Sequence, residues 1–254
     1  MLINSTWIQH EIGYDGKGCK RGDNLPAVRK VQEWLILHGI GVAVDGNFGP
    51  ATQRAVKAFQ EKHAISVNGI VNSDTFSALT APLQRALSPL AGAPTLGETM
   101  IACAEQHLRE HPLEVGGQNR GPWVRLYMEG NEGKEWAWCA GFACFIMRQA
   151  VEALQTLLPV HPTFSCDELA SRSRTSGIFV SGEHLTEPTT ELTPGSIFLH
   201  RSTSKDWTHT GIVVDLQPET FVTIEGNTND EGSREGYEVC KRIRGYDNMD
   251  FIKI

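Results

Sequence analysis

The sequence VDGNFGPATQRAV at residues 44–56 returns 23 residues later in a related form, VNGI at residues 67–70 followed by TFSAL at residues 75–79. Each copy places Asp or Asn before a glycine, and such pairs favour tight turns because both residues tolerate positive φ. Each copy then continues through a threonine into an apolar pair with helical spacing. In the first copy, Pro50 is suited to the opening turn of a helix. The repeat therefore predicts two similar turns, each leading into a helix.

A further helix is predicted upstream of the repeat. Val28, Val31 and Leu35 keep the spacing of one helical face, and Gly39 is suited to end the helix. We therefore expect a helix over residues 26–38 and a compact three-helix core over residues 24–82. The N-terminal domain is assigned to residues 1–82.

The next stretch has the composition of a linker. Residues 81–98 contain three prolines and many small side chains, which is typical of a semi-rigid connection. Another helical pattern begins near Thr99 and ends before Pro112. We therefore place a linker at residues 83–98 and a second domain at residues 99–254. The chain of 254 residues has room for two domains of roughly 100–150 residues each.

The two parts of the chain differ in charge. Residues 1–85 carry nine basic and seven acidic side chains, whereas residues 86–254 carry 14 basic and 23 acidic ones, and the net charge is −7. An acidic excess without clustered Lys and Arg argues against a nucleic-acid-binding protein. No apolar run approaches the ~18–20 residues that a membrane span needs, so we expect no membrane insertion. We expect a monomer.

The N-terminus and the cysteines indicate in which cellular compartment the protein is made. The opening residues MLINSTW lack a basic segment followed by about 7–15 apolar residues, so no Sec signal is visible. We expect synthesis in the cytoplasm, with action on the target after release or after export by another route. The cysteines form no C-x-x-C pair and are expected to be mostly free thiols. They stand at positions 19, 103, 139, 144, 166 and 240.

The sequence WAWCAGFACFIM at residues 136–147 contains a candidate nucleophile. It begins with aromatic and polar residues and then becomes continuously apolar, which predicts a loop entering a buried helix at or just after Cys139. A thiol at a helix N-terminus feels the positive end of the helix dipole, which favours the thiolate. A cysteine nucleophile also needs a base.

His209 is the candidate base. Residues 207–215 predict a strand, residues 217–220 a turn, and the return strand over residues 221–227 brings Glu225 and Asn227 towards His209. A loop of three or five residues would place His209 opposite Asn227 and on the same face as Glu225, whereas two or four residues would reverse the parity. A carboxylate on one imidazole nitrogen would leave the other nitrogen to face the sulfur.

The N-terminal domain resembles the peptidoglycan-binding type 1 domain, a small helical module that binds the bacterial cell wall. The likeness rests on the helix over residues 28–39, the turn VDGxFGxxT at residues 44–52, the helix AVxxFQ at residues 55–60, and the repeat. The resemblance implies peptidoglycan as the partner of this module. It assigns that binding to no particular side chain.

Residues 114–229 resemble the CHAP family, the cysteine, histidine-dependent amidohydrolase/peptidases. The matching pieces are, in order, GQNRG at residues 117–121 with Tyr127, WCAxF at residues 138–142, PGSIF at residues 194–198, HTGIV at residues 209–213, and IEGNT at residues 224–228. The family implies a papain-like α+β domain with an antiparallel sheet, and so an α+β class for the chain. Ser196 departs from the family, which usually has Asp there, and the insert over residues 151–190 matches less well.

The CHAP resemblance also implies a role for each matching residue. Cys139 would be the nucleophile, His209 the base and Glu225 the residue that orients the histidine, with Asn227 as a polar auxiliary. The residues implied in substrate binding are Gln118, Asn119 and Trp138.

The implied activity is hydrolysis of an amide bond in peptidoglycan. The enzyme would act as an N-acetylmuramoyl-L-alanine amidase or as an endopeptidase within the stem or cross-bridge. A phage endolysin is the preferred interpretation, ahead of an antibacterial effector. A non-catalytic wall-binding protein with a papain-like recognition domain, or a hydrolase of ordinary peptides, would also fit these motifs. The acidic segment over residues 129–135 only faintly resembles a calcium loop, so we expect neither a metal nor a cofactor.

Overall fold

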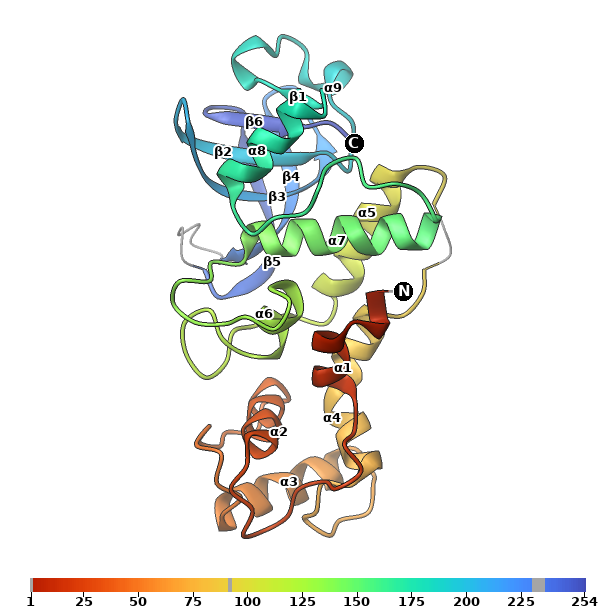
Figure 1. Ribbon diagram of the computed structural model, residues 1–254, viewed down its shortest axis with the longest axis vertical. Coiled ribbons are helices and arrows are strands. Elements are labelled where there is room, and N and C mark those ends of the chain that lie inside the picture. The colour runs from red at the N-terminus through yellow and green to blue at the C-terminus, as the bar shows by residue number, and fades with distance from the viewer. Residues whose placement is uncertain (1, 91–92, 230–235) are drawn as a thin grey trace. The chain divides into compact units, whose positions relative to one another are not determined.

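The computed structural model describes residues 2–90, 93–229 and 236–254, and these form two compact units. The helical unit comprises Ile3–Leu87 and Leu113–Gly133. The sheet unit comprises the described residues of Met1–Leu2, Ser88–Pro112 and Lys134–Ile254. The first is built from helices, and the second combines helices with an antiparallel sheet (Figure 1). The α+β class expected from the sequence is therefore confirmed.

Proline is the first residue of three helices in the helical unit, at Pro26, Pro50 and Pro122. Its helices are α1 (Thr6–Ile12), α2 (Pro26–Leu37), α3 (Pro50–Lys62), α4 (Ser73–Ala86) and α6 (Pro122–Tyr127), and a 3-10 turn over Leu2–Asn4 precedes them. Pro26 and Pro50 each lie in the first turn, where a missing N–H leaves no helical hydrogen bond unmade. Gly39, which follows α2, has a positive φ of 80°. The predicted helix over residues 26–38 and the helix opening at Pro50 are both present.

A buried glutamine holds the first turn of the repeat. The side-chain amide of Gln32 donates to Asp45 Oδ1 at 2.8 Å, to the Asn47 carbonyl at 3.1 Å and to Thr52 Oγ1 at 3.1 Å. Its carbonyl oxygen accepts from the backbone N–H groups of Asp45 at 3.0 Å and Gly46 at 2.8 Å. One side chain thus supplies the hydrogen-bond partners that the turn cannot find within itself.

A second buried glutamine repeats this arrangement in the second turn. The amide of Gln60 donates to Asn68 Oδ1 at 3.1 Å, the Ile70 carbonyl at 2.9 Å and Thr75 Oγ1 at 3.0 Å. Its carbonyl accepts from the N–H groups of Asn68 at 3.0 Å and Gly69 at 2.8 Å. The 23-residue sequence repeat is therefore also a repeat of hydrogen bonding.

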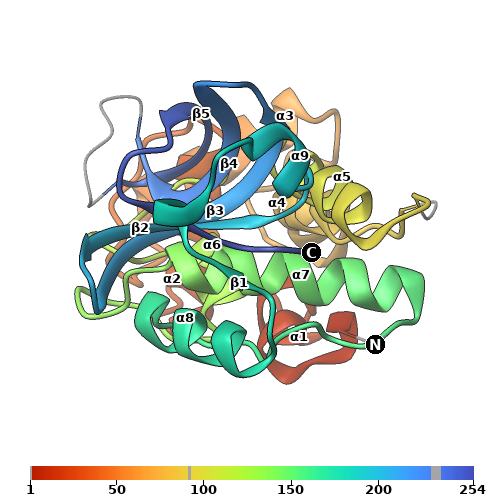
Figure 2. The same cartoon turned by 90° about the horizontal axis from the view of Figure 1, so that it is seen from above.

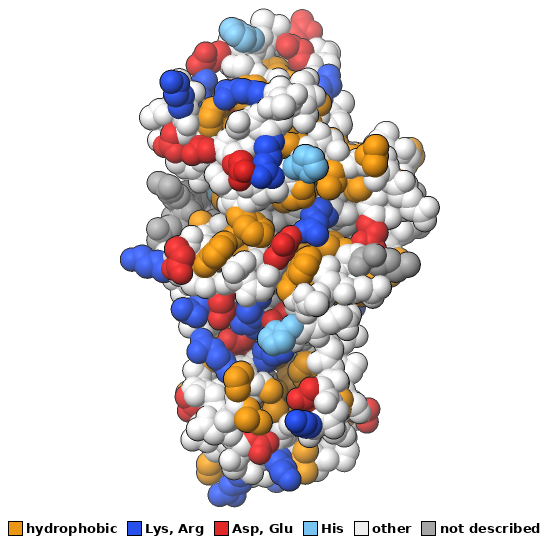
Figure 3. Space-filling view, viewed as in Figure 1, with side chains coloured by type: hydrophobic (Ala, Val, Ile, Leu, Met, Phe, Trp, Pro, Cys, Tyr) orange, Lys and Arg blue, Asp and Glu red, His pale blue; other side chains and the backbone are white. Residues whose placement is uncertain are grey.

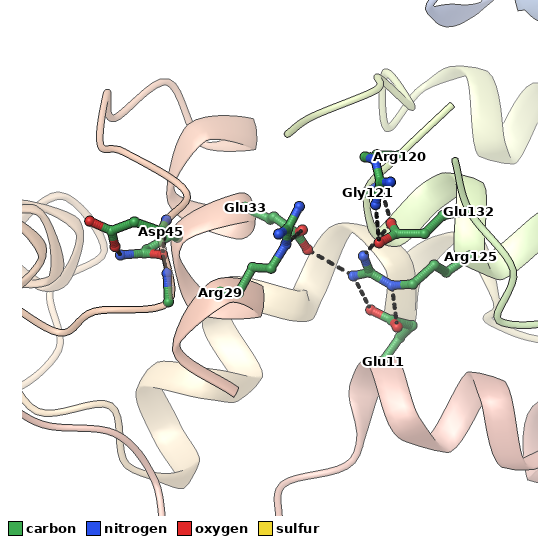
Figure 4. A network of polar contacts seen from close by, with 10 residues as sticks. Glu11, Arg29, Glu33, Asp45, Arg120, Gly121, Arg125 and Glu132 are labelled. Atoms are coloured by element: carbon green, nitrogen blue, oxygen red, sulfur yellow. Dashed lines mark hydrogen bonds and ion pairs between the residues drawn. The ribbon is translucent and has the colours of Figure 1, made fainter. Parts of the chain in front are cut away.

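Residues 113–133 are bound to the helical unit in part by one largely buried arginine (Figure 4). Arg125, in α6, makes ion pairs of 2.8 Å with Glu11 of α1, Glu33 of α2 and Glu132. A buried carboxylate is costly unless a cation compensates it. This network explains why the segment groups with α1 and α2, whereas the sequence-based boundary placed all of residues 99–254 in one domain.

The connection between α4 and the next helix is shorter than the linker predicted over residues 83–98. Helix α4 continues to Ala86 with Pro82 inside it, and α5 (Leu96–Leu108) begins before the predicted start at Thr99. Thr95 and Glu98 form a capping box, in which each side chain accepts a hydrogen bond from the other residue's backbone N–H, at 3.2 and 3.1 Å. Within the predicted linker, residues 91–92 lie outside the described residues.

The sheet unit contains a six-stranded sheet in the order β1-β6-β2-β3-β4-β5, in which every neighbouring pair is antiparallel. Its strands are β1 (Phe179–Val180), β2 (Ile197–Thr203), β3 (Asp206–Leu216), β4 (Thr220–Thr228), β5 (Glu238–Gly245) and β6 (Met249–Ile252). The other helices are α7 (Cys139–Leu154), α8 (Cys166–Thr175), α9 (Pro188–Glu191) and a 3-10 turn over Gly182–His184. Helix α7 lies against β3 and β4, α5 packs on α7, and α8 contacts β3 (Figures 1 and 2).

The hairpin of β3 and β4 contains a β-bulge. Leu216 pairs with Phe221, which leaves four residues in the turn, but a register shift between Val213 and Asp215 inserts one extra residue in β3. A four-residue turn alone would put His209 and Glu225 on opposite faces. The bulge at Val214 reverses that parity and returns the two residues to one face.

Charged side chains are mixed on the surface. On the face drawn in Figure 3, Lys and Arg alternate with Asp and Glu instead of gathering in one basic patch. Across the described residues, no helix combines the length and the hydropathy that crossing a membrane would require.

Candidate active site

Cys139 is the first residue of α7, as the sequence predicted for the start of this buried helix. Its side chain is 5% exposed, and the preceding Trp138 is fully buried. Gly226, in β4, allows this close packing, because a Cβ there would lie 2.6 Å from Phe142 Cβ and 2.7 Å from Trp138 Cζ3. The N-terminus of α7 therefore lies directly against the strand that contains Glu225.

His209 is bonded to Glu225 across the hairpin. His209 Nε2 lies 2.8 Å from Glu225 Oε2, and both side chains are buried. Gly211 makes room for the carboxylate, since a Cβ at this position would come within 2.8 Å of Glu225 Cγ. With Nε2 donating to Glu225, the ring nitrogen Nδ1 is the one that can exchange a proton with Cys139. Nδ1 is buried and has no hydrogen-bond partner in the described part of the chain.

Two further side chains hold the Glu225 carboxylate. Arg244 of β5 binds it at two points, with Nε 2.5 Å from Oε1 and Nη2 2.6 Å from Oε2. The Thr223 hydroxyl donates to Oε1 at 2.5 Å. Burial raises the pKa of Glu225, but the bonds from Arg244 and His209 outweigh it and hold the pKa at about 2. The group is therefore a carboxylate at neutral pH.

The electrostatics of the site favour an ion pair between thiolate and imidazolium. Burial lowers the pKa of His209, but the Cys139 sulfur and Glu225 outweigh it and raise the pKa to about 9. The pKa of Cys139 is held well below its usual range, chiefly by the Cys166 thiol and then, against the effect of burial, by His209 and the Ala140 N–H. Cys139 is thus primed as a nucleophile and His209 as a proton donor.

Among the described residues, no hydrogen bond joins Asn227 to His209. It lies in β4 with a positive φ of 55° and is buried, and its side-chain oxygen has no hydrogen-bond partner among the described residues. The sequence left open which of Glu225 and Asn227 holds His209, and the geometry assigns that contact to Glu225.

The three residues expected to bind substrate are divided between the two units. Trp138 is fully buried against Gly226 and cannot offer a face to a substrate. Gln118 and Asn119 belong to the helical unit, whereas Cys139 belongs to the sheet unit. Asn119 is buried with φ at 51°, and its backbone N–H donates to Glu114 Oε2 at 2.7 Å. The turn over residues 117–121 is thus built on local hydrogen bonds within the helical unit.

Sequence reasoning missed two residues of the site. Arg244 pairs with Glu225, and Cys166 places its sulfur 3.8 Å from that of Cys139. A buried carboxylate such as that of Glu225 requires a cation, so the alternating arginines of β5 were the available signal for Arg244. For Cys166, no pattern in the sequence indicated proximity to Cys139, since 27 residues separate them.

All six cysteines are buried free thiols. Among the described residues, no group of three or more His, Cys, Asp or Glu side chains is arranged to hold a metal ion.

The comparison with known families gives one match. Residues 24–79 match the family described as "Putative peptidoglycan binding domain", and this range contains the two turns, α2, α3 and the first half of α4. No curated protein matches the chain. The match supports the peptidoglycan-binding module expected from the sequence, and it associates the chain with the bacterial cell wall.

Proposed function

We propose that this chain is a peptidoglycan hydrolase with a cysteine nucleophile, and that its sheet unit has the papain-like architecture of the CHAP family. One observation carries the proposal: Cys139 begins α7 beside His209, whose second ring nitrogen is bonded to the buried Glu225. A thiol, an imidazole and a carboxylate in this order form the constellation used for acyl transfer. The match over residues 24–79 supports the cell wall as the location of the substrate.

In the first half of the reaction, the Cys139 thiolate attacks the carbonyl carbon of a wall amide. In this proposal, backbone N–H groups at the start of α7, including that of Cys139, stabilise the oxyanion. His209 then gives the Nδ1 proton to the nitrogen of the leaving amine, and the carbon–nitrogen bond breaks. The product is a thioester on Cys139.

In the second half, His209 takes a proton from water, and the resulting hydroxide attacks the thioester. The thioester bond breaks, the carboxylic acid leaves, and the Cys139 thiolate returns. Glu225 fixes the ring of His209 throughout, while Arg244 keeps Glu225 ionised and in place. Arg244 is thus a positioning residue in this scheme.

The same catalytic groups serve two kinds of bond. Cleavage at muramoyl-L-alanine would make the protein an amidase, and cleavage within the stem or cross-bridge would make it an endopeptidase. We propose an endolysin-like enzyme, made in the cytoplasm and acting on the wall after release, in which the N-terminal module raises the local concentration of wall amides near Cys139. An antibacterial effector would use the same chemistry.

The decisive experiment is clearing of purified bacterial walls, followed as turbidity. Wild-type protein should clear the walls and Cys139→Ala should not. Cys103→Ala, which replaces a buried thiol of α5, is the matched control and should clear as the wild type does. Equal clearing by Cys139→Ala would overturn the cysteine mechanism. Mass spectrometry of the released muropeptides then identifies the bond that is cut.

Wall binding is tested separately, with full-length Cys139→Ala sedimented together with walls. Retention without clearing is expected from this variant. A wild-type protein that is retained but never clears would instead support a non-catalytic wall-binding protein. A protein that hydrolyses peptides without being retained would support a hydrolase of ordinary peptides.

A further inference from the structure

Two cysteine sulfurs meet at the candidate active site. Sγ of Cys139 and Sγ of Cys166 lie 3.8 Å apart, and each cysteine is the first residue of its helix, α7 or α8. The side chains are 5% and 7% exposed. The sulfurs of a disulfide lie about 2 Å apart, so this pair must close by about 2 Å to form the bond. The two thiols therefore already lie next to each other in the reduced state.

Local contacts fix Cys166 in this position. The Ser165 side chain accepts from the Glu168 N–H at 3.3 Å and so caps α8. Asp167 Oδ1 accepts from the Trp207 backbone N–H at 2.6 Å, which ties the first turn of α8 to β3. Trp207 stands two residues before His209, so the strand that supplies the base also anchors the second cysteine.

The two thiols differ strongly in acidity. The pKa of Cys139 lies well below its usual range, with the Cys166 thiol as the largest cause. The pKa of Cys166 lies well above its usual range, because it donates to the Cys139 sulfur and is buried. By contrast, burial raises the pKa of Cys103 to about 12 and that of Cys144 to about 11. Oxidants attack thiolates, so Cys139 is the thiol most open to oxidation among these four.

We propose that Cys139 and Cys166 form a reversible disulfide under hydroperoxide oxidation, with Cys139 as the residue attacked and Cys166 as the residue that resolves the product. The Cys139 thiolate attacks one peroxide oxygen, the O–O bond breaks, and Cys139 becomes a sulfenic acid while hydroxide leaves. The Cys166 sulfur then attacks the Cys139 sulfur, its S–H proton leaves with the hydroxyl as water, and the S–S bond forms. The two sulfurs together lose two electrons, and the peroxide gains them.

The disulfide would protect the sulfur of the nucleophile from further oxidation. While bonded to Cys166, Cys139 can neither attack an amide nor proceed to the irreversible sulfinic acid. A dithiol reductant restores both thiols by exchange. The control of hydrolysis rests on the proposed function, because it requires Cys139 to be the nucleophile, whereas formation of the disulfide does not.

The test treats full-length reduced protein with hydrogen peroxide and reads the product by mass spectrometry. We expect a loss of about 2 Da in the intact mass and a peptide pair linked through Cys139 and Cys166. Dithiothreitol should restore the original mass and, in the wall-clearing assay, the original rate. Accumulation of Cys139 sulfinic acid in the wild type, about 32 Da heavier, without the linked pair would overturn the proposal.

Variants separate the resolving role from general damage. Cys166→Ala should lose the linked pair, accumulate the sulfinic acid on Cys139 and fail to recover with dithiothreitol, and Cys166→Ser should do the same. Cys103→Ala, the matched control, should form the bond as the wild type does. Recovery by both Cys166 variants would contradict the proposal. A linked pair in a protein that never clears walls would overturn the hydrolase and leave the redox pair standing.

Discussion

Arg244 and Glu225 face each other from neighbouring strands in a two-point ion pair, with contacts of 2.5 and 2.6 Å, and the same carboxylate holds His209. Removing one partner of a buried ion pair leaves the other charge uncompensated. We therefore predict that Arg244→Gln lowers the free energy of unfolding by about 3 kcal/mol. Urea unfolding measures the change.

The control is Arg242→Gln, on the same strand. It loses only a hydrogen bond to the Asn229 carbonyl and should lower the free energy of unfolding by about 1 kcal/mol. Equal losses of unfolding free energy in the two variants would contradict the view that Arg244 compensates the buried charge of Glu225.

The raised pKa of His209 predicts where activity falls at high pH. In the proposed mechanism the leaving amine takes a proton from His209, so kcat/KM should decline as the pH rises through about 9. Glu225 contributes to raising this pKa, so Glu225→Gln should move the decline to lower pH by about one unit. The pH profile of wall clearing gives the measurement. Glu219→Gln, in the exposed turn, is the control. If the activity of Glu225→Gln still declined at about pH 9, Glu225 would not be the residue that raises the pKa of His209.

Arg125 should determine whether mild acidification raises or lowers the free energy of unfolding. In the wild type, burial raises the pKa of Glu11, but the hydrogen bonds with His10 and Arg125 outweigh it and lower the pKa from 4.5 to about 2. The contribution of Glu11 to stability is therefore full above pH 4.5 and is lost as the pH falls towards 2. That contribution is about 3 kcal/mol. In Arg125→Met, the buried Glu11 loses the guanidinium that binds it at two points, and its pKa should rise. The variant should therefore gain stability on mild acidification, where the wild type does not. The free energies of unfolding of the wild type and Arg125→Met, measured between pH 3 and pH 7, test this prediction. If both proteins changed in stability with pH in the same way, the prediction would be wrong.

The two glutamines make equivalent predictions. Gln60→Ala removes the partner of two backbone N–H groups in the second turn and should lower the free energy of unfolding by about 2–3 kcal/mol. Gln32→Ala should have a similar cost in the first turn. Gln53→Ala, on the same helix as Gln60, is the control and should change stability by less than about 0.5 kcal/mol. Losses no larger than that of the control would show that the turns stand without the glutamines.

The sequence predicted the helices of the N-terminal module well, because their signals are local. Pro26, Pro50 and the apolar periodicity act within one or two turns of helix, and the structure begins α2 and α3 where these residues stand. The role of Gln32 and Gln60 in holding the turns was not recognised, because the two glutamines are not separated by the 23-residue period. Gln32 stands 13 residues before Asp45, whereas Gln60 stands eight before Asn68.

The candidate site was predictable only where residues lie on one helix or one hairpin. The start of α7 at Cys139 and the approach of His209 to Glu225 follow from local pattern. The contacts of Arg244 and Cys166 depend on tertiary packing, which pairs β5 with β4 and sets α8 against β3. The grouping of residues 113–133 with the helical unit depends likewise on ion pairs that span 92 and 114 positions.

Val214 is the one residue of this hairpin that stands outside the ladder, so its removal would leave the pairs on both sides of it unchanged. Deleting Val214 would join the pair Val213–Thr223 directly to the pair Asp215–Val222 and keep His209 on the same face as Glu225. If Val214 instead paired with Thr223 in the chain of full length, every residue before it in β3 would shift by one and His209 would face away from Glu225. A natural sequence that keeps the contact between histidine and carboxylate but lacks the bulge should therefore be one residue shorter in this strand.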